Sequence, residues 1–252
     1  MSRGGFGAIA SILSLAYANA LSQAPTADPA AMLSRADAPH DAFQEGVIRL
    51  RVVVRERGRE PVANLLELFA RGTDQSLCVF REGKQKGRKI LTLGDRVFLI
   101  VPGASRPVPV SKSQRLMGAA SFGDIAQLRF ADTYQATLRP DEEPVAGKDG
   151  ETPCHVLDLK AVRAGSAYPT AVLWAGRDDG LARRLRLSLA SGKEAKEVLF
   201  TSYGDKHRVA TMEIRDLLAK GGENVTALIF ESYEPRALDP QTFDPEGARA
   251  VP

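Results

Sequence analysis

Residues 87–134 read GRKILTLGDRVFLIVPGASRPVPVSKSQRLMGAASFGDIAQLRFADTY. Within them, two apolar runs, 90–93 and 97–101, flank Gly94 and Asp95. A glycine first in a two-residue connection suits a type II′ turn, which predicts a tight antiparallel hairpin. The second run does not alternate with polar residues, although a strand with one wet face should alternate. Both of its faces should therefore be covered, by helices, by another sheet or by an apolar ligand.

The residues after this hairpin predict a change from strand to helix. Three prolines between positions 102 and 109 end regular pairing, because proline donates no ladder hydrogen bond. Residues 121–124, Ser-Phe-Gly-Asp, resemble a capping box ahead of a short apolar run. We expect a short helix with an apolar side made by Phe122, Ile125 and Leu128.

The composition excludes several classes of protein. The 252 residues include 34 basic and 31 acidic side chains, for a net charge of +3. This balance, without basic runs interleaved with aromatic residues, argues against a nucleic-acid partner. Hydrophobic residues make up 44% of the chain, which is enough for a full core and argues against wholesale disorder.

The N-terminal residues have the pattern of a secretory signal peptide. Arg3 precedes an apolar stretch, 6–18, and Ala18-Asn19-Ala20 forms a small-residue cleavage site. The stretch is shorter than the roughly 20 apolar residues of a membrane span. The sequence thus predicts a signal peptide over 1–20 and a single β domain over 21–252. The mature protein should be soluble and exported, and periplasmic in a Gram-negative host.

The remainder of the chain is dominated by strand patterns. Residues 47–54, for example, place Ile48, Leu50, Val52 and Val54 on one face. About ten or eleven such short runs are separated by polar turns. Residues 139–150 are acidic and contain prolines, so an exposed connection is expected there. Phe243 stands alone among turn formers in the C-terminal tail.

Helical signals are few. Asp28 and Pro29 open a helix of about two turns that ends near Pro39 and carries Met32, Leu33 and Ala36 on one face. Such a short helix is marginal alone and must dock on an apolar surface. The pattern as a whole predicts a β-dominated antiparallel fold, a barrel or a strongly curved sheet, rather than a doubly wound α/β fold.

The two cysteines, Cys78 and Cys154, leave two alternatives open. An even number of cysteines in an exported protein allows a disulfide. Two buried thiols that behave as small hydrophobic residues are the other interpretation.

The sequence contains no recognisable catalytic constellation. His40, His155 and His207 lie far apart, each without a partner at ligand spacing. No nucleophile elbow, zinc-protease motif or phosphate loop is present. We therefore expect neither an enzyme nor a metal or other cofactor. An exported sheet with an excess apolar face could instead hold an acyl chain. The alternative is that loops and helices simply pack that face.

Several segments together resemble the LolA-like outer-membrane lipoprotein-sorting family. The central segments are 87–91, 94–99 with Pro102, 113–118 and 122–126. Further pieces are 32–37, 154–159, Tyr168 with 172–174, and 238–243. The resemblance covers nearly all of the expected mature chain, and its central part is the most specific.

The resemblance implies an incomplete, strongly bent antiparallel β-barrel with short helices over its concave face. It also implies a periplasmic carrier that shelters acyl chains of lipoproteins or other lipids between an inner-membrane donor and an outer-membrane acceptor. We expect a monomer that works without covalent catalysis. The competing hypothesis is a non-catalytic interaction module that assists an envelope transporter or assembly complex. Candidate residues for the apolar cavity are Val97, Phe98, Leu99, Ile100, Leu116, Met117, Phe122, Ile125 and Leu128.

Overall fold

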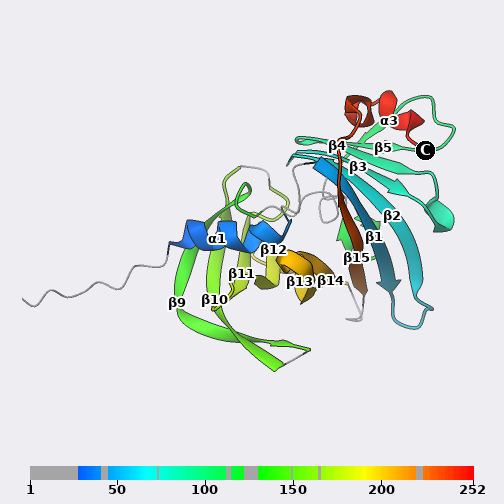
Figure 1. The fold of residues 1–252 in the computed structure, drawn as a ribbon. Coiled ribbons are helices and arrows are strands. Elements are labelled where there is room, and N and C mark those ends of the chain that lie inside the picture. Colours follow the sequence, from blue (N-terminus) through cyan, green and yellow to red (C-terminus); the bar gives the residue numbers. More distant parts are fainter. Residues whose placement is uncertain are drawn as a thin grey trace, which may run out of the picture.

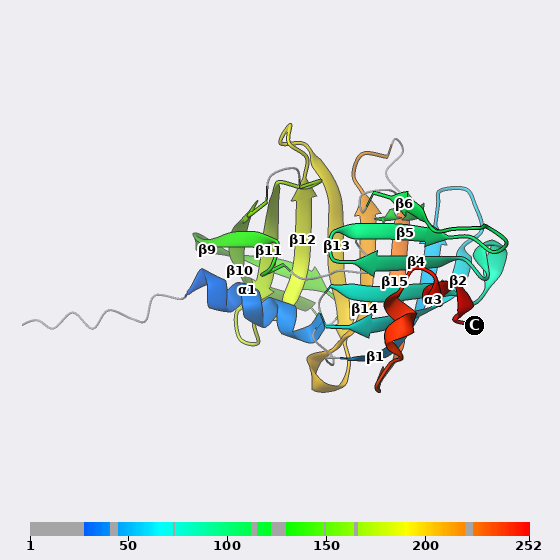
Figure 2. The ribbon, with the colours of Figure 1, turned by 90° about the horizontal axis from the view of Figure 1, so that it is seen from above.

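The computed structural model of the protein describes residues 28–40, 45–72, 74–111, 115–121, 130–148, 150–163, 166–219 and 224–252. Thirteen strands of this part form one antiparallel sheet that bends strongly but does not close, because its edge strands do not pair with each other (Figure 1, Figure 2). The β-dominated, half-open fold expected from the sequence is confirmed. In sheet order the strands are β6 (Val108–Val110), β5 (Arg96–Ile100), β4 (Lys89–Leu93), β3 (Gln75–Phe80), β2 (Val62–Arg71), β1 (Glu45–Arg55), β15 (Val225–Pro235), β14 (Val209–Asp216), β13 (Glu194–Tyr203), β12 (Ala182–Ser188), β11 (Thr170–Gly176), β10 (Gly150–Ala161) and β9 (Tyr134–Gly147).

Short helices and one small hairpin complete the described structure. Helix α1 lies against the β9 end of the sheet, and α3 lies beside β4 and β5 (Figure 1). The remaining elements are α1 (Pro29–Asp37), η1 (Ala38–His40), η2 (Gly83–Gln85), β7 (Arg115–Met117), β8 (Ala120–Ser121), η3 (Asp205–His207), η4 (Pro240–Phe243) and α3 (Gly247–Ala250).

One apolar cluster joins the two arms of the sheet, and the face that carries it is called the inner face below. Every one of the thirteen strands contributes at least one side chain to this cluster or packs against it. The alternation expected for 47–54 is part of it, since Ile48, Leu50 and Val52 are buried there. Because residues of both arms contact one another, the inner face is the main core of the protein.

The hairpin of β4 and β5 explains why the run 97–101 is apolar on both faces. Leu93 and Arg96 pair across Gly94 and Asp95, and Gly94 has a φ of +57°, as a type II′ turn requires. Val97 points into the inner cluster, whereas Ile100 packs on the outer face with Phe243 of η4. The outer cover is thus the C-terminal tail, in which Phe243 is 5% exposed.

The expected connection over 139–150 is wrong for most of its length. Strand β9 continues to Gly147, and its pairing with β10 includes Pro144 and extends to Gly147. This part therefore forms a long hairpin. Prolines are tolerated because β9 is an edge strand. Backbone N–H groups that point away from the sheet make no hydrogen bond to a neighbouring strand, so their loss costs nothing there. The acidic side chains are nevertheless exposed.

Helix α1 forms as its sequence predicts. The Asp28 side chain accepts a hydrogen bond from the Ala30 N–H at 3.0 Å, and Pro29 occupies the first turn. Leu33 and Ala36 are buried in the inner cluster, so the helix docks on the sheet rather than standing alone.

The β7–β8 hairpin rests directly on the central strands. Gly118 has a φ of +53°, and a Cβ added there would lie 2.7 Å from Val54 Cγ1. The next residue, Ala119, donates its N–H to the hydroxyl of the fully buried Thr226 at 2.8 Å. Glycine is therefore required both by backbone conformation and by the close approach to β1 and β15. The helix expected around Phe122 to Leu128 lies outside the described residues.

The cysteines lie on opposite faces of the sheet, and both are free and buried. Cys78 of β3 belongs to the inner cluster, whereas Cys154 of β10 packs with Val156 and Trp174 in a separate outer cluster. Burial raises the pKa of Cys78 to about 12 and that of Cys154 to about 11. The structure therefore has the two buried thiols and not the disulfide.

We predict that Thr226→Val destabilises the protein by about 1 to 3 kcal/mol, because the buried Ala119 N–H loses its acceptor while the side chain keeps its shape. Thr201→Val is the matched control, since the exposed Thr201 hydroxyl bonds only the Thr211 carbonyl and should cost under about 0.5 kcal/mol. Urea unfolding curves measure both values. Equal losses in the two variants would show that the hairpin is not held by Thr226.

We also predict that the unreduced protein exposes two reactive thiols on unfolding in denaturant and reacts slowly when native at neutral pH. Burial keeps both groups protonated, and the thiolate is the reactive form. Titration with a thiol reagent checks this. An unfolded, unreduced sample without reactive thiols would contradict the structure.

Candidate functional site

The sequence-predicted cavity residues of β5 divide between the two faces of the sheet. Val97 is 3% exposed in the inner cluster, and Leu99 shares its face because side chains alternate along a strand. Phe98 and Ile100 belong to the outer cluster under the C-terminal tail. The structure therefore leaves Val97 and Leu99 as candidates for contact with a ligand on the inner face.

The other predicted residues belong to the segment that covers the inner face. Met117 of β7 is 7% exposed and packs into the inner cluster. The side chain of Leu116 and the whole of Phe122, Ile125 and Leu128 lie outside the described residues. Met117 thus belongs to the β7–β8 hairpin, which packs on the inner face of the sheet, and not to the sheet itself.

One margin of the inner face exposes apolar side chains. Leu99 is half-buried and lies opposite Val108 of the edge strand β6, which is 48% exposed. Directly opposed residues of an antiparallel pair point to the same face. The margin at β5 and β6 therefore offers an apolar surface that continues into the core.

Strand β15, between β1 and β14 in the sheet, carries two aromatic side chains that pack against the inner cluster. Phe230 and Tyr233 of β15 stack with ring centroids 5.8 Å apart, and both pack partly buried against the inner cluster. The Tyr233 hydroxyl donates to the Val209 carbonyl at 2.7 Å, and Arg208 lies 5.2 Å from its ring centroid. Burial raises the pKa of Tyr233 well above its usual range. The sequence analysis did not predict this aromatic pair. The alternation of apolar residues along β15 could have indicated which of its side chains face the core.

Three backbone N–H groups make hydrogen bonds in the segments that cover the inner face, two of them between these segments and one to the sheet. Asp37, at the end of α1 and 2% exposed, accepts from the Phe130 N–H at 2.7 Å and the Ala131 N–H at 2.6 Å. The third is the bond from Ala119 to Thr226. We call α1 together with the described residues 115–121 and 130–131 the cover. Asp37 joins two of these segments, α1 and 130–131, which the sequence did not indicate.

A hollow of about 160 Å³ lies beside β8, lined by Ala119, Tyr168, Lys196 and Leu218 among others. Since a water molecule takes about 30 Å³ of liquid volume, this hollow has room for only a few waters. A larger apolar ligand does not fit this hollow as the described residues now shape it.

The described residues do not assemble a metal site or a membrane-spanning helix. No group of three His, Cys, Asp or Glu side chains is placed to hold a metal ion in this part of the chain. His155 Nδ1 lies 3.3 Å from a Glu142 carboxylate, and His207 is exposed in η3. None of the helices within the described ranges is long and apolar enough to cross a bilayer.

Comparison with known proteins supports the fold. A crystal structure of a LolA superfamily protein from Nitrosomonas europaea has a TM-score of 0.77 at 21% identity, over 87% of this chain and 99% of that one. A DUF1329 family protein from Desulfovibrio piger has a TM-score of 0.71 at 20% identity, over 86% and 98% of the two chains.

A domain from Vibrio parahaemolyticus, described as an outer membrane lipoprotein-sorting protein, has a TM-score of 0.69 at 15% identity, over 86% and 97% of the chains. No curated protein matches the sequence. A family model described as that of an uncharacterized protein matches residues 72–247, more than half of the chain. The chain therefore belongs to this family, and its fold is that of the LolA-like outer-membrane lipoprotein-sorting proteins.

Proposed function

We propose that the protein is a carrier that binds acyl chains of a lipoprotein or another lipid on its inner face, beneath the cover. The observation that carries this proposal is the single apolar cluster to which all thirteen strands contribute, on a sheet that does not close. Binding is by desolvation, with no covalent step and no cofactor. The exposed apolar margin at Leu99 and Val108 is the place where a chain enters.

The energies involved favour exchange between the cover and an acyl chain. Each methylene transferred from water to the apolar face contributes about 0.8 kcal/mol. The bond from Ala119 to Thr226, which joins the cover to the sheet, contributes roughly 1 to 3 kcal/mol. A chain of about ten methylenes contributes about 8 kcal/mol, which outweighs this bond and offsets part of the apolar contact that the cover gives up.

The proposed setting follows from the leader and the fold. The signal peptide over 1–20 exports the single domain over 21–252 to the periplasm, where the monomer takes its cargo from an inner-membrane donor and delivers it to an outer-membrane acceptor. The fold of the sorting-protein domain from Vibrio parahaemolyticus supports this direction of transfer.

The test is native mass spectrometry of the mature protein taken gently from its own periplasm, followed by organic extraction. We expect discrete added masses that extract as acylated species. A bare mass that stays bare when lipids are offered would contradict the carrier. A bare mass with a defined protein partner would support the interaction module instead.

Neighbouring residues of β5 supply a matched pair of variants. Leu99→Glu places a carboxylate on the inner face and should reduce bound lipid by about tenfold or more, because a charge in an acyl site is strongly unfavourable. Phe98→Glu makes the same kind of change on the outer face and should leave bound lipid unchanged. Circular dichroism shows whether both variants fold. Equal lipid loads in the two folded variants would remove Leu99 from the site.

A further inference from the structure

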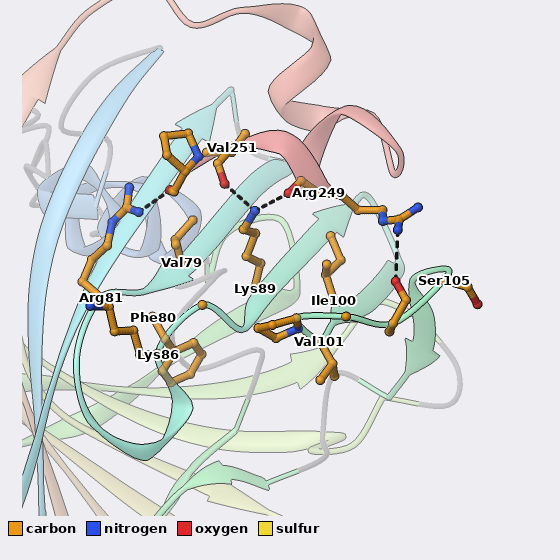
Figure 3. A pocket seen from close by; sticks show the side chains of 15 residues that line it. Val79, Phe80, Arg81, Lys86, Lys89, Ile100, Val101, Ser105, Arg249 and Val251 are labelled. Carbon is orange, nitrogen blue, oxygen red and sulfur yellow. Dashed lines mark hydrogen bonds between the residues drawn. The ribbon is translucent and has the colours of Figure 1, made fainter.

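A hollow lies on the outer face among the described residues, away from the proposed acyl site. It is an open cleft of about 490 Å³ between the turn before β4, the loop after β5 and the C-terminal tail (Figure 3). Its apolar walls include Ile100, Val101, Pro102 and Val251. The cleft is therefore a separate site, independent of the carrier proposal.

The backbone builds the closed end of this cleft. Gly87 has a φ of +82°, and a Cβ added there would lie 3.0 Å from Pro102 Cγ. This close approach brings the turn that carries Lys86 against the loop after β5. The third wall is fixed by Arg249, which donates to the Ala104 carbonyl at 3.0 Å.

The charged side chains that line the cleft have one sign, and one of them, Arg81, donates to the main-chain oxygen of Pro252 in the same lining. Its lining residues include the cations Arg81, Lys86, Lys89 and Arg249, and no Asp or Glu side chain. Arg81 pairs with Glu67 and Arg249 with Glu246, which lie outside the lining. Lys86 and Lys89 make no ion pair in the described part of the chain, so two positive charges stay uncompensated.

Lys89 supplies a fixed positive charge beneath the tail. Its side chain is buried, with 7% exposure of the residue, and Nζ donates to the carbonyl of Ala248. It also donates to the carbonyls of Arg249 and Val251 (Figure 3). These acceptors are neutral, so the charge is not cancelled. Burial and the nearby Arg81 lower the pKa of Lys89, which shows that its charged form is disfavoured by its surroundings. A bound anion would relieve this.

Lys86 supplies the hydrogen-bond donors. It is exposed on the rim of the cleft, and its ammonium group makes no hydrogen bond within the described residues. An ammonium group has three donors, and charge-assisted bonds to anionic oxygens are among the strongest hydrogen bonds in proteins. Lys86 can thus bind an anion at the rim without breaking any existing contact.

We propose that this cleft binds a phosphate group, as the free ion or as the headgroup ester of a lipid. A phosphate group offers several anionic oxygen acceptors to Lys86 and lies in the positive field of Lys89 and Arg81. The adjacent apolar wall of Ile100, Val101 and Pro102 suits the organic part of an ester. The bound anion would thereby compensate Lys86 and Lys89, the two lining cations that make no ion pair in the described part of the chain.

The test compares Lys86→Glu with Lys84→Glu. Both lysines are exposed and lie two positions apart, but Lys84 does not line the cleft. Isothermal titration with inorganic phosphate and with glycerol 3-phosphate, at constant ionic strength, should show affinity about tenfold or more lower for Lys86→Glu and unchanged for Lys84→Glu. Equal weakening in both variants would mean that phosphate is attracted by the general charge of the protein, and this would overturn the site. The site would also be overturned if the original protein bound phosphate in neither titration and did not bind vesicles.

Vesicles distinguish the two sources of phosphate. We expect the original protein to float with phosphatidylglycerol vesicles more than the Lys86→Glu variant does if the ligand is a lipid headgroup. If inorganic phosphate binds in the titration and the original protein floats with vesicles no more than Lys86→Glu does, the ligand is the free ion. Flotation that Lys84→Glu reduces as much as Lys86→Glu does would overturn the cleft as the binding site.

Discussion

An open sheet with an apolar inner face cannot leave that face in water, and the rest of the structure depends on this constraint. The sheet buries side chains from all thirteen strands in one cluster, yet β6 and β9 do not meet to close a barrel. Segments that are not part of the sheet must therefore complete the core. Helix α1 and the β7–β8 hairpin do this, and Asp37 of α1 also holds the N–H groups of Phe130 and Ala131.

The two faces of the sheet are covered in physically different ways. On the outer face the C-terminal tail is held by Phe243 in an apolar cluster and by the buried Lys89 ammonium on three carbonyls. On the inner face the cover is held by apolar contacts and by the bond from the Ala119 N–H to the Thr226 hydroxyl. An acyl chain can take over the apolar contacts of the inner cover, whereas it offers nothing to replace the carbonyl ligands of Lys89. This asymmetry is why we assign the movable side to the inner face.

The sequence predicts most of the sheet because alternation and turn residues are local signals. The run 47–54 and the Gly94-Asp95 turn lie where their patterns indicate, and α1 begins at its Asp28 cap. The β9 extension was missed because prolines signal a loop unless the strand is known to be an edge. Contacts between distant residues left no local pattern. Asp37 with Phe130, and Phe243 on β3 to β5, appear only once the chain is folded. For the same reason the sequence could not assign Phe98 and Ile100 to the outer face.

The most direct test of the central claim is amide hydrogen exchange of the mature protein with and without a saturating excess of palmitate. The account predicts that the amide of Ala119 loses protection by about tenfold or more when palmitate binds, because its bond to Thr226 joins the cover to the sheet. The amides of Thr242 and Ala248 in the outer tail should be unchanged. Palmitate that binds while the Ala119 amide keeps its protection would contradict an acyl site beneath a movable cover.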